Sequence, residues 1–169
     1  MKKLTSVLTA ALMMAVIATG CSKDESENME ENKQTYQYNY FEEPILDFSL
    51  TLEQLKAREK HQILHDNLWE PWPHETTNAP DPWLVRYVYN DQDIPARVCY
   101  FFPDKKAHGL YAIQIEWDLE QGINAKIKAQ LDERYGEGET DESGRIQYIS
   151  TQKGIRIQKG VSSVTYFPL

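Results

Sequence analysis

The stretch WLVRYVYNDQDIPARVCYFF, residues 83–102, decides the fold of this sequence. Its two ends, residues 83–89 and 96–102, are rich in β-branched and aromatic residues, which favour extended strands. The separator NDQDIP holds the Asn, Asp and Pro residues that are typical of short connections. The stretch therefore predicts two antiparallel strands joined by a turn.

The next apolar run, GLYAIQIEW at residues 109–117, extends this hairpin into a meander. Apolar side chains at positions 111, 113, 115 and 117 alternate with Gln114 and Glu116. A period of two predicts a strand with one buried and one solvated face. Three further short strands are expected in the runs RIQYIST, GIRIQ and SVTYFPL, which lie between residue 145 and the last residue.

Two helices are expected, one before each group of three strands. Thr51 is a suitable N-cap with Gln54 three residues later, so the first helix is predicted to run to about Asp66. The second is predicted from about Gln121 to Tyr135, where apolar residues recur one turn apart and a glycine follows. The fold class is therefore α+β, with two successive α-β-β-β units and both helices packed on one face of an antiparallel sheet.

Between the first helix and the hairpin lies LWEPWPHETTNAPDPW, in which four prolines exclude a helix or a central strand. Trp69, Trp72 and Trp83 lie in this segment, and they are candidates for binding a ligand or a partner. Exposed tryptophan is often the energetic centre of a recognition surface. Burial against the end of the core is the alternative, and we favour it because large aromatic side chains stabilise small domains.

The N-terminus has the pattern of a secretory signal. Lys2 and Lys3 precede an apolar stretch of about 14 residues, which is shorter than the roughly 20 residues that span a bilayer. Small residues at positions 18–20 then precede Cys21. This border resembles the lipobox of bacterial lipoproteins, with Ala18 where leucine is usual. The resemblance implies that the signal is removed and that Cys21 carries acyl chains.

Residues after Cys21 bear on localisation. Lys23 and the acids that follow resemble the export signal of surface-exposed lipoproteins of the Bacteroidetes, and a solvated acidic linker is the alternative. Ser22 in place of aspartate permits transfer to the outer membrane under the sorting rule of enteric-type bacteria. We therefore expect a lipid-anchored protein of the cell envelope, in the outer membrane.

Three regions are expected from these patterns. Residues 1–20 form the cleaved signal, 21–44 an acidic tether and 45–169 a single α+β domain. Tyrosines alternate at positions 36, 38 and 40, so an edge strand remains an alternative for the end of the tether. The formal charge of the chain is −8, and loss of Lys2 and Lys3 makes it −10. A nucleic-acid partner is disfavoured, because phosphates require a basic surface.

Two histidines and two acids are the candidate metal-binding or catalytic residues. His61 and His65 have the i, i+4 spacing of helical metal ligands, but Gln62 stands where the H-E-x-x-H motif has its general base. We interpret both histidines as part of a solvated helix face and keep the metal site as the alternative. Glu116 and Asp118 are interpreted as surface charge. No cofactor and no enzymatic activity are predicted.

The order and length of the elements over roughly residues 50–169 resemble small α+β lipoproteins and inhibitors. These are grouped with β-lactamase-inhibitor-like and outer-membrane assembly lipoproteins. The resemblance implies a non-catalytic binding or envelope-associated module, anchored to the membrane by its lipid, with an envelope protein as partner. A glycan-binding accessory that uses the tryptophans is the alternative, and a small hydrolase is the least favoured one.

Overall fold

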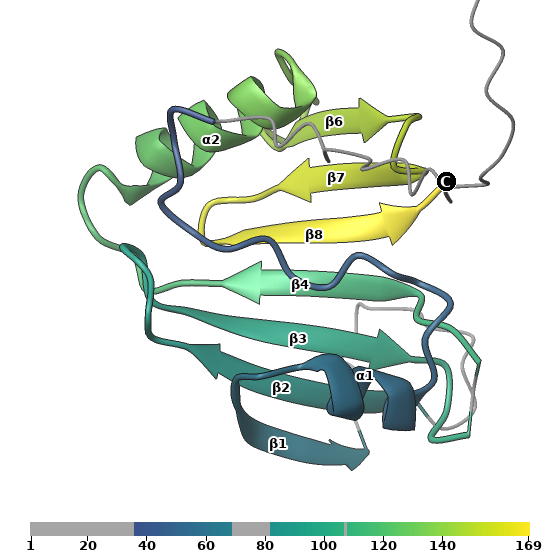
Figure 1. The fold of residues 1–169 in the computed structure, drawn as a ribbon. Coiled ribbons are helices and arrows are strands. Elements are labelled where there is room, and N and C mark those ends of the chain that lie inside the picture. The colour runs from purple at the N-terminus through teal and green to yellow at the C-terminus, as the bar shows by residue number, and fades with distance from the viewer. Residues whose placement is uncertain (1–35, 69–81, 107) are drawn as a thin grey trace, which may run out of the picture. The chain divides into compact units, whose positions relative to one another are not determined.

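The computed structural model describes residues 36–68, 82–106 and 108–169, which form an eight-stranded antiparallel sheet with two helices (Figure 1). Cys21, Trp69 and Trp72 lie outside the described residues. The helices are α1 (Leu52–Arg58) and α2 (Ile123–Tyr135). The strands are β1 (Gln62–Leu68), β2 (Trp83–Tyr89), β3 (Ala96–Phe102), β4 (Ala112–Glu116), β5 (Glu139–Thr140), β6 (Ile146–Ser150), β7 (Ile155–Lys159) and β8 (Ser163–Pro168). The mixed α+β class predicted from the sequence is confirmed, with sheet as its larger part.

The predicted hairpin and meander are confirmed. Strands β2 and β3 pair without interruption from Trp83 opposite Phe102 to Tyr89 opposite Ala96. Strand β4 pairs with β3, and it also pairs with β8. The β4–β8 pairing joins the two halves of the chain into one sheet, in the order β1-β2-β3-β4-β8-β7-β6-β5.

Both helices pack on the same face of this sheet. Leu52 and Leu55 of α1 share one hydrophobic cluster with Ile127 and Leu131 of α2 and with the inward residues of six strands. Figure 1 shows α1 drawn over β2 and α2 beside β6. The predicted repeat of one helix and three strands is not confirmed, because in the described part of the chain four strands follow each helix.

The first helix is shorter than predicted. Its start is confirmed, since Thr51 and Gln54 form a complete capping box. The predicted end at Asp66 is wrong, because the helix stops at Arg58 and residues 62–68 form β1. Antiparallel pairing with β2 supplies backbone hydrogen bonds that outweigh the weak helical periodicity of this segment.

Residues 36–44 form neither helix nor strand, and they pack against α2. The buried Gln130 accepts hydrogen bonds from the backbone N–H groups of Tyr40 (2.5 Å) and Phe41 (3.1 Å), and it donates to the Phe41 carbonyl (2.6 Å). The side chain of Phe41 belongs to the main hydrophobic cluster. The segment that the sequence assigned to the end of the tether is therefore held on the folded domain.

Among the described residues, no helix combines the length and the hydropathy that crossing a membrane requires.

Candidate functional site

A polar hollow of about 580 Å³ lies where residues 36–44 meet the connection between β2 and β3. We call it the polar hollow, and its walls carry mostly charged and amide side chains. The lining residues are Tyr36, Asn39, Glu42, Glu43, Lys60, Asp91, Gln92, Asp93 and Arg134. Both signs of charge are present, so the hollow suits a polar or charged ligand group better than an apolar one.

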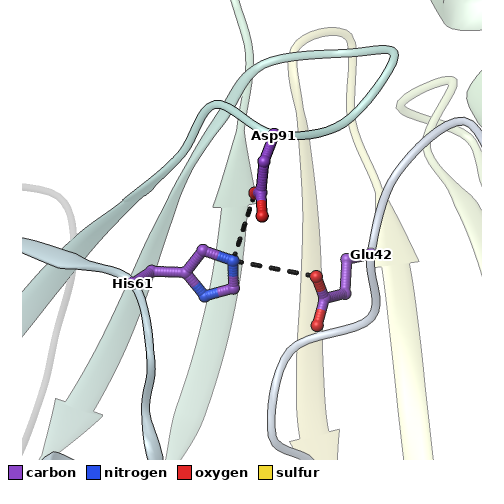
Figure 2. Close-up of side chains that lie close together, drawn as sticks. All are labelled: Glu42, His61 and Asp91. Carbon is purple, nitrogen blue, oxygen red and sulfur yellow. Dashed lines mark ion pairs between the residues drawn. The ribbon is translucent and has the colours of Figure 1, made fainter.

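His61 lies beside two acids of the hollow and forms with them the His61 cluster: Glu42, His61 and Asp91 (Figure 2). The Nε2 atom of His61 is 3.7 Å from Glu42 Oε2 and 3.4 Å from Asp91 Oδ1. One atom from each of the three residues falls within 4.8 Å of the other two. The cluster thus presents one imidazole nitrogen and two carboxylate oxygens toward a common point.

The position of the His61 ring is fixed by Glu59. The Nδ1 atom of His61 is 2.6 Å from Glu59 Oε1, and the Glu59 side chain is only 2 % exposed. Hydroxyl groups of Tyr89 (2.6 Å) and Tyr100 (3.0 Å) donate to the other Glu59 oxygen. Burial raises the pKa of Glu59, but the hydrogen bonds from Tyr89, His61 and Tyr100 outweigh it and hold that pKa below its ordinary value.

Because Glu59 is an ionised acceptor, it places a proton on Nδ1 and leaves Nε2 facing the two acids. The imidazole also stacks on Tyr89, with ring centroids 3.5 Å apart and an interplanar angle of 18°. Its side chain is 7 % exposed, and Nε2 has no hydrogen-bond partner among the described residues. A buried polar atom without a partner is costly and calls for a functional or structural explanation.

Lys60 forms an ion pair with Glu42. Its Nζ lies 3.2 Å from Glu42 Oε1, while the other oxygen of Glu42 faces His61. The Lys60 side chain is 67 % exposed and is therefore held weakly.

The prediction that His61 and His65 lie on one helix is wrong. His61 lies in the bend between α1 and β1, whereas His65 lies exposed on β1, beyond a register shift in the β1–β2 pairing. His61 and His65 therefore do not form a helical metal-binding pair, and only His61 joins a cluster.

Trp83 is the one candidate tryptophan in the described chain. It lies at the start of β2, partly buried against the main hydrophobic cluster. Its indole N–H donates to Asp66 (2.7 Å), and the Lys105 ammonium lies 4.6 Å from its ring centroid. These contacts agree with the interpretation that this tryptophan supports the fold.

Glu116 and Asp118 are both near Arg97, which lies 3.8 Å from the first carboxylate and 3.1 Å from the second. This arrangement agrees with their interpretation as surface charge.

Sequence reasoning missed Glu42, Glu59 and Asp91. Glu42 falls within the expected tether and Asp91 within a turn, so no local spacing connects either of them with His61. Glu59 lies only two residues before His61, and this closeness could have suggested a contact between them. On the predicted helix, however, residues two apart point in different directions.

Comparisons with protein-family models, with curated proteins and with solved structures give no match to this chain.

Proposed function

We propose that this protein is a lipid-anchored lipoprotein of a bacterial outer membrane, and that its folded domain is a non-catalytic binding module. The anchoring part rests on the sequence that ends at Cys21, with two lysines, an apolar stretch and small residues before it. Two or three acyl chains hold a protein stably on a bilayer, whereas one chain binds weakly. The acidic mature chain disfavours close contact with anionic headgroups.

The polar hollow is the observation that carries the binding role. Its volume of about 580 Å³ lies within the usual range of ligand sites, and its charged lining suits a polar group on an envelope protein. Asp91 and Asp93 come from the connection after β2, and Glu42 comes from the segment held by α2. Arg134 of α2 is the third contribution, so three separate parts of the fold supply recognition groups to one place.

A glycan-binding role for the tryptophans is the second candidate. Trp83 bears against it, because its indole N–H and its ring already have partners within the domain. A sugar-binding surface would therefore depend on Trp69 and Trp72. A hydrolase that uses Glu116 and Asp118 is disfavoured by the proximity of Arg97 to both carboxylates.

The anchor is tested by changing each of the two cysteines. We expect Cys21→Ser to leave the membrane fraction, because no acyl chain can be attached. Cys99→Ala is the matched control, and it should stay with the membrane because Cys99 is a buried core residue. Unchanged membrane retention of Cys21→Ser would contradict the anchoring proposal.

The binding role is tested by chemical cross-linking in intact cells that express Asp93→Lys. This change reverses a charge in the polar hollow, and we expect a cross-linked envelope protein to be lost. Glu137→Lys makes the same change at an exposed position outside the hollow and should keep the cross-link. An identical cross-linking pattern for both variants would contradict a binding role of the hollow.

A further inference from the structure

We propose that Glu42, His61 and Asp91 bind a divalent transition-metal ion of the zinc class. This site goes beyond the proposed function and does not depend on it. Its first support is the convergence of one imidazole nitrogen and two carboxylate oxygens within 4.8 Å of one another (Figure 2).

The spacing of the donor atoms fits an ion between them. Zinc bonds of about 2.0–2.2 Å at tetrahedral angles separate neighbouring ligand atoms by roughly 3.3–3.6 Å. The observed separations from Nε2 are 3.4 Å to Asp91 and 3.7 Å to Glu42. A direct charged hydrogen bond would be shorter, at about 2.7–2.9 Å. Both distances from Nε2 are therefore longer than a charged hydrogen bond and match the separation of two ligands on a shared ion.

The burial of His61 is the second, independent support. Its side chain is 7 % exposed, and its Nε2 points toward the two acids without a hydrogen-bond partner in the described residues. Glu59 is hydrogen-bonded to Nδ1, so Nε2 is the ring nitrogen that faces the two acids and can bind a metal. Such a carboxylate behind a ligating histidine is common in zinc proteins, where it orients the ring and makes it more basic.

The mixture of donors selects the class of metal. Calcium and magnesium prefer sites made of oxygen atoms alone, whereas imidazole suits zinc, copper, iron and nickel. Two carboxylates balance the charge of a divalent ion. The exposed Lys60 can move away from Glu42 when a metal takes its place. Three protein ligands also leave a coordination position open for water or for a group from a partner.

Such an ion would connect three segments that are distant in the sequence. Glu42 belongs to the segment packed on α2, His61 follows α1, and Asp91 follows β2. Because the unfolded chain does not hold these groups together, the metal should bind the folded state preferentially and raise the melting temperature.

The test uses the untagged protein as purified from the expressing cells in detergent, stripped with a chelator and then titrated with zinc chloride alone. Calorimetry measures the stoichiometry and Kd, and cobalt chloride serves as a second probe through its absorption spectrum. Asp91→Asn is the main variant, because its side chain is 69 % exposed and the change should not affect folding. Glu42→Gln and His61→Gln complete the set. The matched controls are His65→Gln on β1 and Asp93→Asn in the same turn as Asp91.

We expect one zinc ion per chain, an affinity at least about tenfold weaker in each cluster variant, and less than about a twofold change in the controls. Zinc should also raise the melting temperature of the unmodified chain and of the controls, and at the same zinc concentration it should raise that of Asp91→Asn clearly less. The absence of saturable binding by the unmodified chain would overturn the proposal. Equal weakening by His65→Gln or Asp93→Asn would also overturn it, since neither residue belongs to the His61 cluster.

Discussion

Replacement of Gln130 by methionine should weaken the attachment of Tyr40 and Phe41 to α2. Methionine preserves most of the volume, so the change removes the amide group without opening a large cavity. Gln130 makes three hydrogen bonds to Tyr40 and Phe41, at 2.5, 3.1 and 2.6 Å. The N–H and the carbonyl of the buried Phe41 would both lose their partner.

An unsatisfied buried polar group costs about 1–3 kcal/mol, so these two groups cost about 2–6 kcal/mol together. Methionine is more hydrophobic than glutamine, so its burial offsets part of this cost. The expected net loss in the free energy of unfolding is about 2–4 kcal/mol. Equilibrium urea unfolding measures the loss. Amide hydrogen exchange at Phe41 should accelerate as well, since its N–H is no longer protected.

Gln121→Ala is the control for this prediction, because Gln121 is exposed just before α2. Its free energy of unfolding should change by less than about 0.5 kcal/mol. A loss below about 1 kcal/mol for Gln130→Met, with unchanged exchange at Phe41, would refute the argument that this amide holds the segment.

Three further predictions concern the core around the sheet. The pKa of Glu59 lies below its ordinary value of 4.5, so its contribution to stability is present above that pH and disappears as the pH falls through the folded-state pKa. The difference in unfolding free energy between the unmodified chain and Glu59→Gln should therefore shrink below about pH 4.5. A difference that grows there would contradict this. Burial raises the pKa of Cys99 to about 11. Iodoacetamide at pH 8 should therefore label this thiol only after denaturation. Equal labelling of the native chain would show that the thiol is accessible and would contradict the prediction. A methyl group added at Gly138 would lie 2.5 Å from a side-chain carbon of Ile146 and 2.7 Å from Tyr148. Gly138→Ala should therefore lower the free energy of unfolding by about 1–3 kcal/mol in a urea titration. Gly160→Ala, whose nearest contact is 3.3 Å, should lower it clearly less.

The strands could be predicted because their signals are local. The alternation around Ile113 and the composition of residues 83–102 are properties of the strands themselves, and the turn residues between them agree with the same hairpin. Strand β1 could not be predicted in this way. The run QILHDNL has no clear period, and it becomes a strand because the edge of β2 offers it backbone partners. Its apolar Ile63 is exposed and is not part of the core.

The His61 cluster could not be predicted for a similar reason. Its members come from three segments, and their approach depends on the packing of residues 36–44 against Gln130. The interpretation of His61 and His65 as a helical pair followed from the length of the predicted helix. Because the helix ends at Arg58, the Glu59 side chain can turn toward His61 and become its hydrogen-bond partner. Long-range contacts of this kind leave no spacing in the sequence to be recognised.

Intact-mass analysis of the chain purified from bacterial membranes tests the central claim most directly. The account predicts a processed chain that starts at Cys21 and exceeds its polypeptide mass by a diacylglycerol group, with or without one further acyl chain. A first residue at Cys21 with an unmodified thiol, or a chain that retains residues 1–20 and no lipid, would contradict it.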